Sequence, residues 1–284
     1  MNVGQQLING VILGAGYACI AIGWTVLLGA ARLVNFAHGQ MFMLGAFAAW
    51  FAMHQAGVSY AVSIPIAIVV MAVVGLLMQL AMRRLMLEQN LTSLMIVTLG
   101  FGYVIHGAAA KLFGGNPQTF VSPLEKASIR FGELWFSWQD VLIVAVTLPL
   151  FAALWLVLEH PRVGAAVRAV AEDPKLAQLF GFNPAVVYAG VFVFEAATVA
   201  FAATLVATRS PILPSMGFDE VILTFVVVVL GGVGSVGGTL LASLGLGMFT
   251  AFFGALVSPA YTTAAAFAVV LGVLVLRPGG LSAR

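Results

Sequence analysis

Ionisable side chains inside apolar segments are the first candidates for chemistry, because a charged group is costly in lipid and is usually functional there. Glu195 is the one acid well inside such a segment, and His38, His54 and His106 lie within or beside others, far apart in sequence. No HExxH or GxSxG motif occurs, and the single Cys19 allows neither a disulfide framework nor a cysteine-based metal site. The sequence therefore predicts no catalytic residues and no metal site.

The glycine-rich run GGVGSVGG, residues 231–238, is the only stretch that looks like a phosphate cradle. It lacks the Gly-Lys-Ser/Thr ending with which a Walker motif holds phosphate and magnesium. We expect instead a flexible, tight reversal between two membrane spans. Close packing and gate flexibility are both compatible with it. The residues of this reversal are Gly231, Gly232, Gly234, Ser235 and Gly237.

Composition places the chain in a membrane. Of 284 residues, 62% are hydrophobic and 8% are charged, and the mean hydropathy is +1.10, which is outside the range of soluble domains. Residues 7–30 are uncharged and long enough to span, and too long for the core of a secretory signal. We expect one all-α transmembrane domain over residues 1–284, in contact with lipid. The net charge of +2 argues against nucleic acid as a partner.

Hydropathy divides the chain into a bundle of eight or nine spans. The expected helices cover residues 7–30, 36–55, 58–82, 91–112, 141–158, 184–208, 221–232, 240–256 and 263–276. Glycines recur within them, as at Gly10, Gly14, Gly16, Gly245 and Gly247. Small residues let membrane helices approach closely, so packing is the expected role of these glycines.

Basic residues predict the orientation, because Lys and Arg concentrate in cytoplasmic loops. Two loops carry them most clearly, one with Arg83 and Arg84 and one with Arg162, Arg168 and Lys175. Alternating the spans from these loops puts the N-terminus outside the cytoplasm. Residues Arg32, Arg277 and Arg284 then fall inside, which favours nine spans over eight.

The second of these loops contains a polar stretch, RAVAEDPKLAQLFGFN, between two apolar runs. Asp173 followed by Pro174 is typical of a helix start, and Gly181 of a helix end. Leu176, Leu179 and Phe180 then share one face of a short amphipathic helix. Such a helix could lie in the membrane interface, but the acidic Glu172 and Asp173 suit anionic lipid poorly. We expect it to dock a cytoplasmic partner.

Energy for transport has no visible source in this chain. A gradient-driven carrier needs ionisable groups at membrane depth, and the spans offer little beyond Glu195. Borrowed energy from a partner is therefore the first hypothesis. A stand-alone gradient-driven carrier or channel for a small organic solute is the alternative, and a membrane scaffold without transport is a third.

The polar stretch resembles the cytoplasmic coupling segment of permease subunits in branched-chain amino acid ABC importers of the LivH/LivM type. The pattern falls on Arg168, Ala169, Ala171, Glu172, Asp173, Ala177 and Gly181. The resemblance extends to LVNFAHGQMFMLGAF (33–47), VTLGFG (97–102) and VLGGVGSVGGTLLASLGLG (229–247), so it covers nearly the whole chain in order.

This resemblance implies a multi-pass permease of the bacterial inner membrane with several partners. They are a homologous second permease, two cytoplasmic ATP-binding subunits and a periplasmic solute-binding protein. No cofactor belongs to this chain, since ATP and Mg would be bound by the partner subunits. The coupling segment spans about residues 159–183, with contacts from Arg168, Glu172, Asp173, Pro174, Lys175, Ala177 and Gly181. Of these, Glu172 and Lys175 are expected at the surface, with Ala177 allowing close approach. Relatives of this family also carry urea, amides or aromatic acids, so the solute is left open. A hetero-dimer with the second permease is expected, and a homo-dimer is the alternative.

A translocation pathway or gate is expected where polar residues interrupt the spans. The candidates are Asn35, His38, Gly39 and Gln40 in NFAHGQ, Thr98 and Gly100 in VTLGFG, and Glu195. Asn35 and His38 could equally tie neighbouring helices together by hydrogen bonds. Glu195, where the family usually has a small residue, could bond within the bundle, pair with the second permease or contact solute. Asp219 and Glu220 are expected to face the outer water or the binding protein, and a solvated ion pair with the nearby Arg209 is the alternative.

Overall fold

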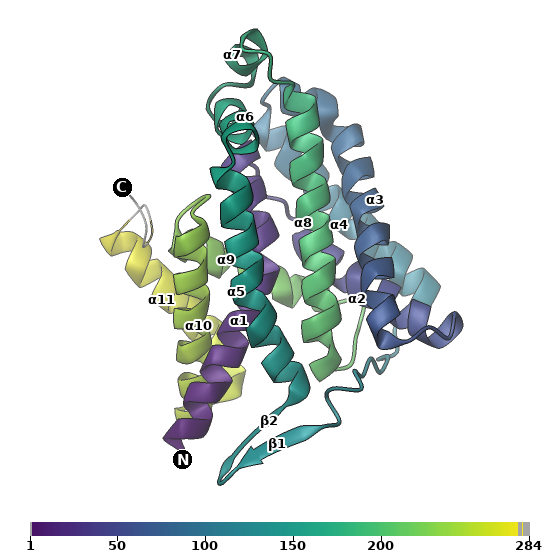
Figure 1. The fold of residues 1–284 in the computed structure, drawn as a ribbon, viewed down its shortest axis with the longest axis vertical. Helices are drawn as coiled ribbons and strands as arrows, with labels where there is room; N and C mark the ends of the chain where they lie inside the picture. Colours follow the sequence, from purple (N-terminus) through teal and green to yellow (C-terminus); the bar gives the residue numbers. More distant parts are fainter. Residues whose placement is uncertain (1, 278–279, 281–284) are drawn as a thin grey trace.

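A computed structural model describes residues 2–277 and 280. The described chain is a helix bundle with one two-stranded antiparallel hairpin (Figure 1). The helices are α1 (Val3–Ala31), α2 (His38–Gln55), α3 (Tyr60–Leu87), α4 (Leu91–Phe113), α5 (Trp138–Glu159), α6 (Pro161–Glu172), α7 (Pro174–Leu179), α8 (Pro184–Val206), α9 (Met216–Gly231), α10 (Val236–Leu256) and α11 (Thr262–Leu276), and the strands are β1 (Ser128–Phe131) and β2 (Leu134–Ser137).

Each of the nine apolar segments expected from hydropathy forms a helix within a few residues of its expected bounds. Among the described residues, seven helical segments are long and apolar enough to cross a membrane. These are α1, α3, α4, α5, α8, α10 and the segment ending in α11. Helix α9 has only 16 residues, fewer than the ~20 that a full span needs, and α2 has 18. The all-α membrane bundle is thus confirmed, and α2 and α9 are not among the segments long and apolar enough to cross.

The centre of the bundle is formed by α1, which packs on α8, α10 and α5, while α8 also packs on α3 and α2. Small residues create the closest of these contacts. A Cβ atom on Gly10 would lie 2.9 Å from the Met248 Cα, and Gly14 meets the backbone of Gly247. The predicted packing role is confirmed for these glycines, whereas Gly245 has open space around its Cα. In lipid, where no hydrophobic effect drives helices together, such close approach supplies the packing energy.

Two elements were missed from the sequence. Helix α6 is amphipathic, and Pro161 begins it at a position that needs no backbone N–H. The hairpin lies in the segment between α4 and α5, where Gly132 adopts a positive φ of 64° at the turn between β1 and β2. The alternation of SIRF and LWFS around this glycine was the signal.

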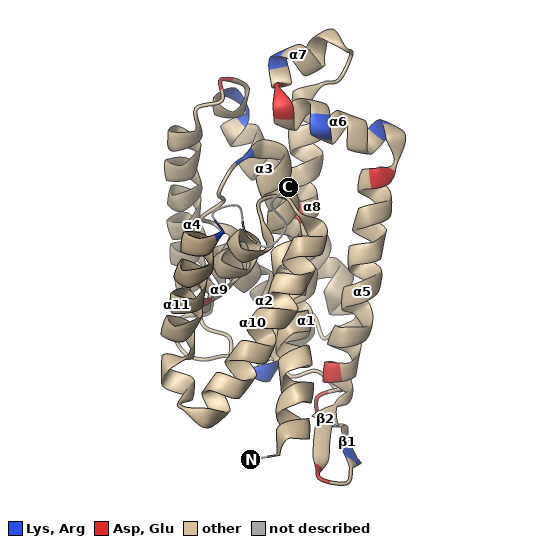
Figure 2. Cartoon of the chain, turned by 90° about the vertical axis from the view of Figure 1, so that its left-hand side faces the viewer, with Lys and Arg blue, Asp and Glu red and all other residues tan. Residues whose placement is uncertain are grey.

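Charged residues gather mostly at the two ends of the bundle (Figure 2). Helices α6 and α7 lie at one end, and the N-terminus and the hairpin lie at the other (Figure 1). At the hairpin end, Arg209 forms an ion pair with Asp140. The start of α5 brings Asp140 to this arginine, so the alternative in which Arg209 pairs with Asp219 does not form. Asp219 is exposed on α9.

Candidate functional site

A buried polar cluster lies at the mid-depth of the bundle. Glu195 is the central residue of α8, with eleven helical residues on either side, so it sits roughly 16 Å from each helix end at 1.5 Å per residue. Its side chain is fully buried. Asn35 and His38, from the connection after α1 and the first turn of α2, are also fully buried and face it. Three of the predicted pathway residues are thus brought together.

Hydrogen bonds account for both oxygens of the Glu195 carboxyl group. Asn35 Nδ2 donates to each oxygen at 3.1 Å, and His38 Nδ1 lies 2.9 Å from Oε1. Asn35 Oδ1 in turn accepts from the Ala37 N–H at 3.0 Å. The Trp24 indole of α1 stacks on the His38 ring, with the centroids 4.8 Å apart. This network fixes the backbone just before α2. Of the three roles considered for Glu195, the structure has hydrogen bonding within the bundle.

The cluster sets the depth at which α2 begins. Because His38 bonds to the middle of α8, the first turn of α2 lies near mid-depth rather than at a membrane surface. Gly39 packs directly on Gly217, the second residue of α9. Helix α9 therefore begins at the same depth, which explains why both helices are short.

Some of the other predicted pathway residues lie beside this cluster and others do not. Thr98 is buried, and its hydroxyl accepts a hydrogen bond from the Phe36 N–H at 3.2 Å, which links α4 to the same connection. Gln40 is buried beside Gly217. Gly100 is exposed, with open space around its Cα, so it does not join the cluster. Trp24 was missed from the sequence, because an aromatic residue within an apolar run gives no distinct signal.

The predicted short helix is present as α7. Asp173 accepts from the Lys175 N–H at 2.7 Å and from the Leu176 N–H at 3.1 Å, and Gly181 follows the helix with φ of 84°. The face that was expected to bury is open: Leu179 is 81% exposed and Phe180 is 78% exposed. Nothing in the described chain covers this face, so it is an open apolar surface outside the spans.

The polar residues around α7 take different places. Glu172 and Lys175 are exposed, as expected. Arg168 donates to the carbonyl of Leu158 at 3.1 Å and so caps the end of α5. Ala177 is 1% exposed and its carbonyl accepts from the Phe182 N–H. The expectation that Ala177 allows a partner to approach closely was wrong, because this residue faces its own chain.

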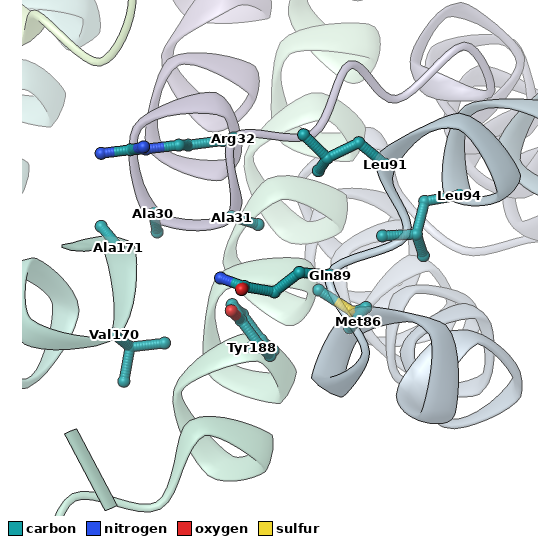
Figure 3. Close-up of a pocket in the computed structure, with 10 residues that line it drawn as sticks. All are labelled: Ala30, Ala31, Arg32, Met86, Gln89, Leu91, Leu94, Val170, Ala171 and Tyr188. Carbon is teal, nitrogen blue, oxygen red and sulfur yellow. The ribbon is translucent and has the colours of Figure 1, made fainter. Parts of the chain in front are cut away.

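A pocket of about 250 Å³ lies below α6, between the ends of α1 and α8 and the turn joining α3 to α4 (Figure 3). Figure 3 shows Gln89 beside Tyr188, with Arg32 pointing away over Ala171. Arg32 and Gln89 have φ of 50° and 54°, and they are the only non-glycine residues with positive φ in the described chain. This conformation costs about 1–2 kcal/mol per residue. Two strained turns therefore meet next to the α6–α7 segment.

The glycine-rich run forms the connection between α9, which ends at Gly231, and α10, which begins at Val236. Gly232 and Gly234 have φ of 95° and 75°, a conformation that favours glycine. Gly234 also contacts Gly29 of α1, where a Cβ would lie 2.8 Å from the Gly29 Cα. Ser235 caps α10 by accepting from the Gly238 N–H. Glycine is therefore required in this connection for two separate reasons, the positive φ of Gly232 and Gly234 and the close contact of Gly234 with α1.

Seven apolar helical segments of membrane-spanning length among the described residues, packed around a buried polar centre, define a multi-pass membrane protein. Sequence comparison makes this specific. Residues 6–276 match the family of branched-chain amino acid transport system permease components, and the chain belongs to this family.

Individual relatives agree. The chain is 32% identical to the high-affinity branched-chain amino acid transport system permease protein BraD of Pseudomonas aeruginosa, over 99% of this chain and 95% of the relative. It is 31% identical to LivH of Escherichia coli K12 with the same coverage. It is also 26% identical to LivM of that organism, over 80% of this chain and 59% of LivM. No solved structure matches the chain.

Proposed function

We propose that this protein is a transmembrane permease subunit of an ABC importer that moves branched-chain or related hydrophobic amino acids inward. The family match and the names of the relatives support the solute class. The energy would come from ATP hydrolysis by partner subunits, since the chain has no Walker motif. Transport would proceed by alternating access around the mid-depth cluster of Asn35, His38 and Glu195.

The open apolar face of α7 is the observation that carries the ATPase partnership. Leu179 and Phe180 project from the end of the bundle where Arg83, Arg84, Arg162 and Arg168 also lie. Basic residues concentrate on the cytoplasmic side of membrane proteins, so this end would face the cytoplasm, with the N-terminus and hairpin outside. A cytoplasmic ATPase subunit would then cover the α7 face, and a periplasmic binding protein would deliver solute at the hairpin end.

A second permease subunit completes the proposed importer. E. coli K12 has two proteins named as permeases of the high-affinity branched-chain amino acid transport system, LivH and LivM, and both resemble this chain. A pair of permeases would supply two α7 faces for two ATPase subunits. We therefore expect a heterodimer with a homologous chain.

The test compares two phenylalanines of equal exposure at opposite ends of the bundle. Phe180 on the α7 face and Phe131 on the hairpin are each 78% exposed. We expect Phe180→Asp to abolish co-purification of the ATPase subunits and ATP-dependent amino acid uptake, because it buries an unpaired charge at the interface. Phe131→Asp should retain the ATPase. Normal co-purification of the ATPase subunits with the Phe180→Asp variant would contradict the docking proposal. Uptake by liposomes holding this chain alone, driven by sodium or pH, would favour the carrier instead.

A further inference from the structure

Two helices begin in the middle of this bundle, and their first turns touch. A Cβ on Gly217 would lie 2.5 Å from the carbonyl oxygen of Gly39, so the backbones of α2 and α9 are in direct contact. The first turn of a helix carries N–H groups without helical partners and a partial charge of about +0.5. Two such positive ends therefore meet near the depth of Glu195.

Backbone N–H groups at this contact remain available. Within the described chain, the N–H groups of Gly39, Gln40 and Gly217 donate no hydrogen bond. The turns on either side are satisfied, since His38 N donates to Asn35 O and Phe218 N donates to Ser215 O. The unbonded donors thus concentrate where the two helix starts face each other.

Buried polar side chains without hydrogen-bond partners are a second, independent indication of a binding site here. Gln40 is 1% exposed, yet neither carboxamide atom has a hydrogen-bond partner in the described chain. Its Oε1 lies 2.8 Å from the position that a Gly217 Cβ would occupy, so the carboxamide is at the first turn of α9. Trp24 Nε1 and His38 Nε2 are also buried without a partner. An unpaired polar group is costly to bury, and a ligand that bonded these groups would offset this cost.

We infer that the paired starts of α2 and α9, together with the Gln40 carboxamide, form the membrane-depth site that binds the carboxylate of the transported solute. The inference rests on the proposed function, since it concerns how that importer holds its amino acid. The site offers unpartnered donors, namely the backbone N–H groups of the two helix starts and Gln40 Nε2. Discontinuous helices in other transporters present their N-terminal ends to anionic solute groups for the same electrostatic reason.

Of the nearby acids whose side chains the structure describes, Glu195 and Asp219 do not occupy this position. The Glu195 carboxyl group is held by Asn35 and His38. Asp219 follows Gly217 by two residues, which turns it about 200° around α9, and it is exposed. In the present conformation, Gly39 and Gly217 close the site against each other. The carboxylate enters between the two helix starts when α2 and α9 separate, and the partly exposed Phe36 and Phe218 would face the apolar side chain of the solute.

The experiment uses the complete importer in liposomes, with binding protein and ATPase subunits, and measures ATP-dependent uptake of radiolabelled leucine. Gln40→Met removes the carboxamide with little change in volume, and Gln40→Glu places a negative charge at the site. Gln79 of α3, also 1% exposed and with an unpaired Nε2, provides the matched control Gln79→Met. Co-purified ATPase reports assembly for each variant.

We expect Gln40→Met to lower uptake at least tenfold, since a hydrogen bond to a charged group is lost. Gln40→Glu should abolish uptake, because its carboxylate repels that of the solute, and Gln79→Met should stay within twofold of wild type. Wild-type uptake by Gln40→Glu would indicate a cation site and overturn the inference. Equal losses in the two Met variants would reduce Gln40 to a packing role and overturn it as well. Either result with an active wild-type importer leaves the proposed function standing, whereas a wild type that imports no amino acid fails both.

Discussion

Replacing Glu195 by alanine tests whether the mid-depth cluster positions α2. The substitution removes the acceptor for both Asn35 Nδ2 bonds and the partner of His38 Nδ1. It leaves two fully buried polar groups unpaired, at about 1–3 kcal/mol each. Interhelical hydrogen bonds in membranes average only about 0.6 kcal/mol, because the unfolded chain in lipid also finds partners. We therefore expect a loss of about 2–4 kcal/mol, which includes the cavity left by the carboxyl group.

The assay is reversible unfolding of the purified protein in mixed detergent micelles, with Glu195→Gln as the matched variant. Glutamine keeps the shape and one acceptor oxygen, so we expect it to cost about 1 kcal/mol. A double-mutant cycle with His38→Ala should give a coupling energy of about 0.5–3 kcal/mol, as for residues in contact. A Glu195→Ala variant within 0.5 kcal/mol of wild type, roughly the scatter expected for an uninvolved site, would refute the positioning role.

Three further perturbations follow from the geometry. Gly39→Ala places a Cβ against the Gly217 carbonyl oxygen and should reduce the yield of folded protein or abolish uptake, measured by size-exclusion chromatography and transport. Gln89→Gly relieves a left-handed residue and should stabilise the protein by about 0.5–1 kcal/mol in chemical unfolding, since the relieved strain exceeds the added chain entropy of glycine. Burial, then the charge of Asp140, raises the pKa of Glu125, so ionising Glu125 opposes folding and stability falls as pH rises above about 4.5; Glu125→Gln should raise the thermal midpoint at pH 7 and leave it unchanged near pH 3.

Hydropathy was sufficient to place the nine apolar helices because lipid imposes one requirement on every span, a run of apolar residues with internally satisfied backbone. The start of α7 was equally predictable, since an Asp173 cap followed by Pro174 is local chemistry. The mid-depth cluster was predictable only as a set of candidates. Asn35 and Glu195 are 160 residues apart, and no periodicity within α8 shows which neighbour a carboxyl group will face.

The depths of α2 and α9 were not predictable for a related reason. A hydropathy segment gives a length, and a length of 16 or 18 residues can describe a thin span, a tilted span or a helix that begins inside the bundle. The decision depends on whether a non-helical connection can be buried, which requires partners for its polar groups. Asn35 supplies one such partner to its own backbone and Thr98 supplies another from α4. Two side chains from separate elements are therefore what makes a mid-depth helix start possible here.

Helix α8 connects the two regions on which the proposed transport depends. Asn183 caps α8 two residues after Gly181, by accepting from the Ala185 N–H at 3.1 Å, so α8 continues almost directly from α7. Twelve residues after Asn183, Glu195 bonds to the residues that begin α2. Without a proline or a similar break, a long helix bends only gently. We therefore expect a displacement of α7 by a partner to move α8 and, through the three hydrogen bonds of Glu195, the start of α2.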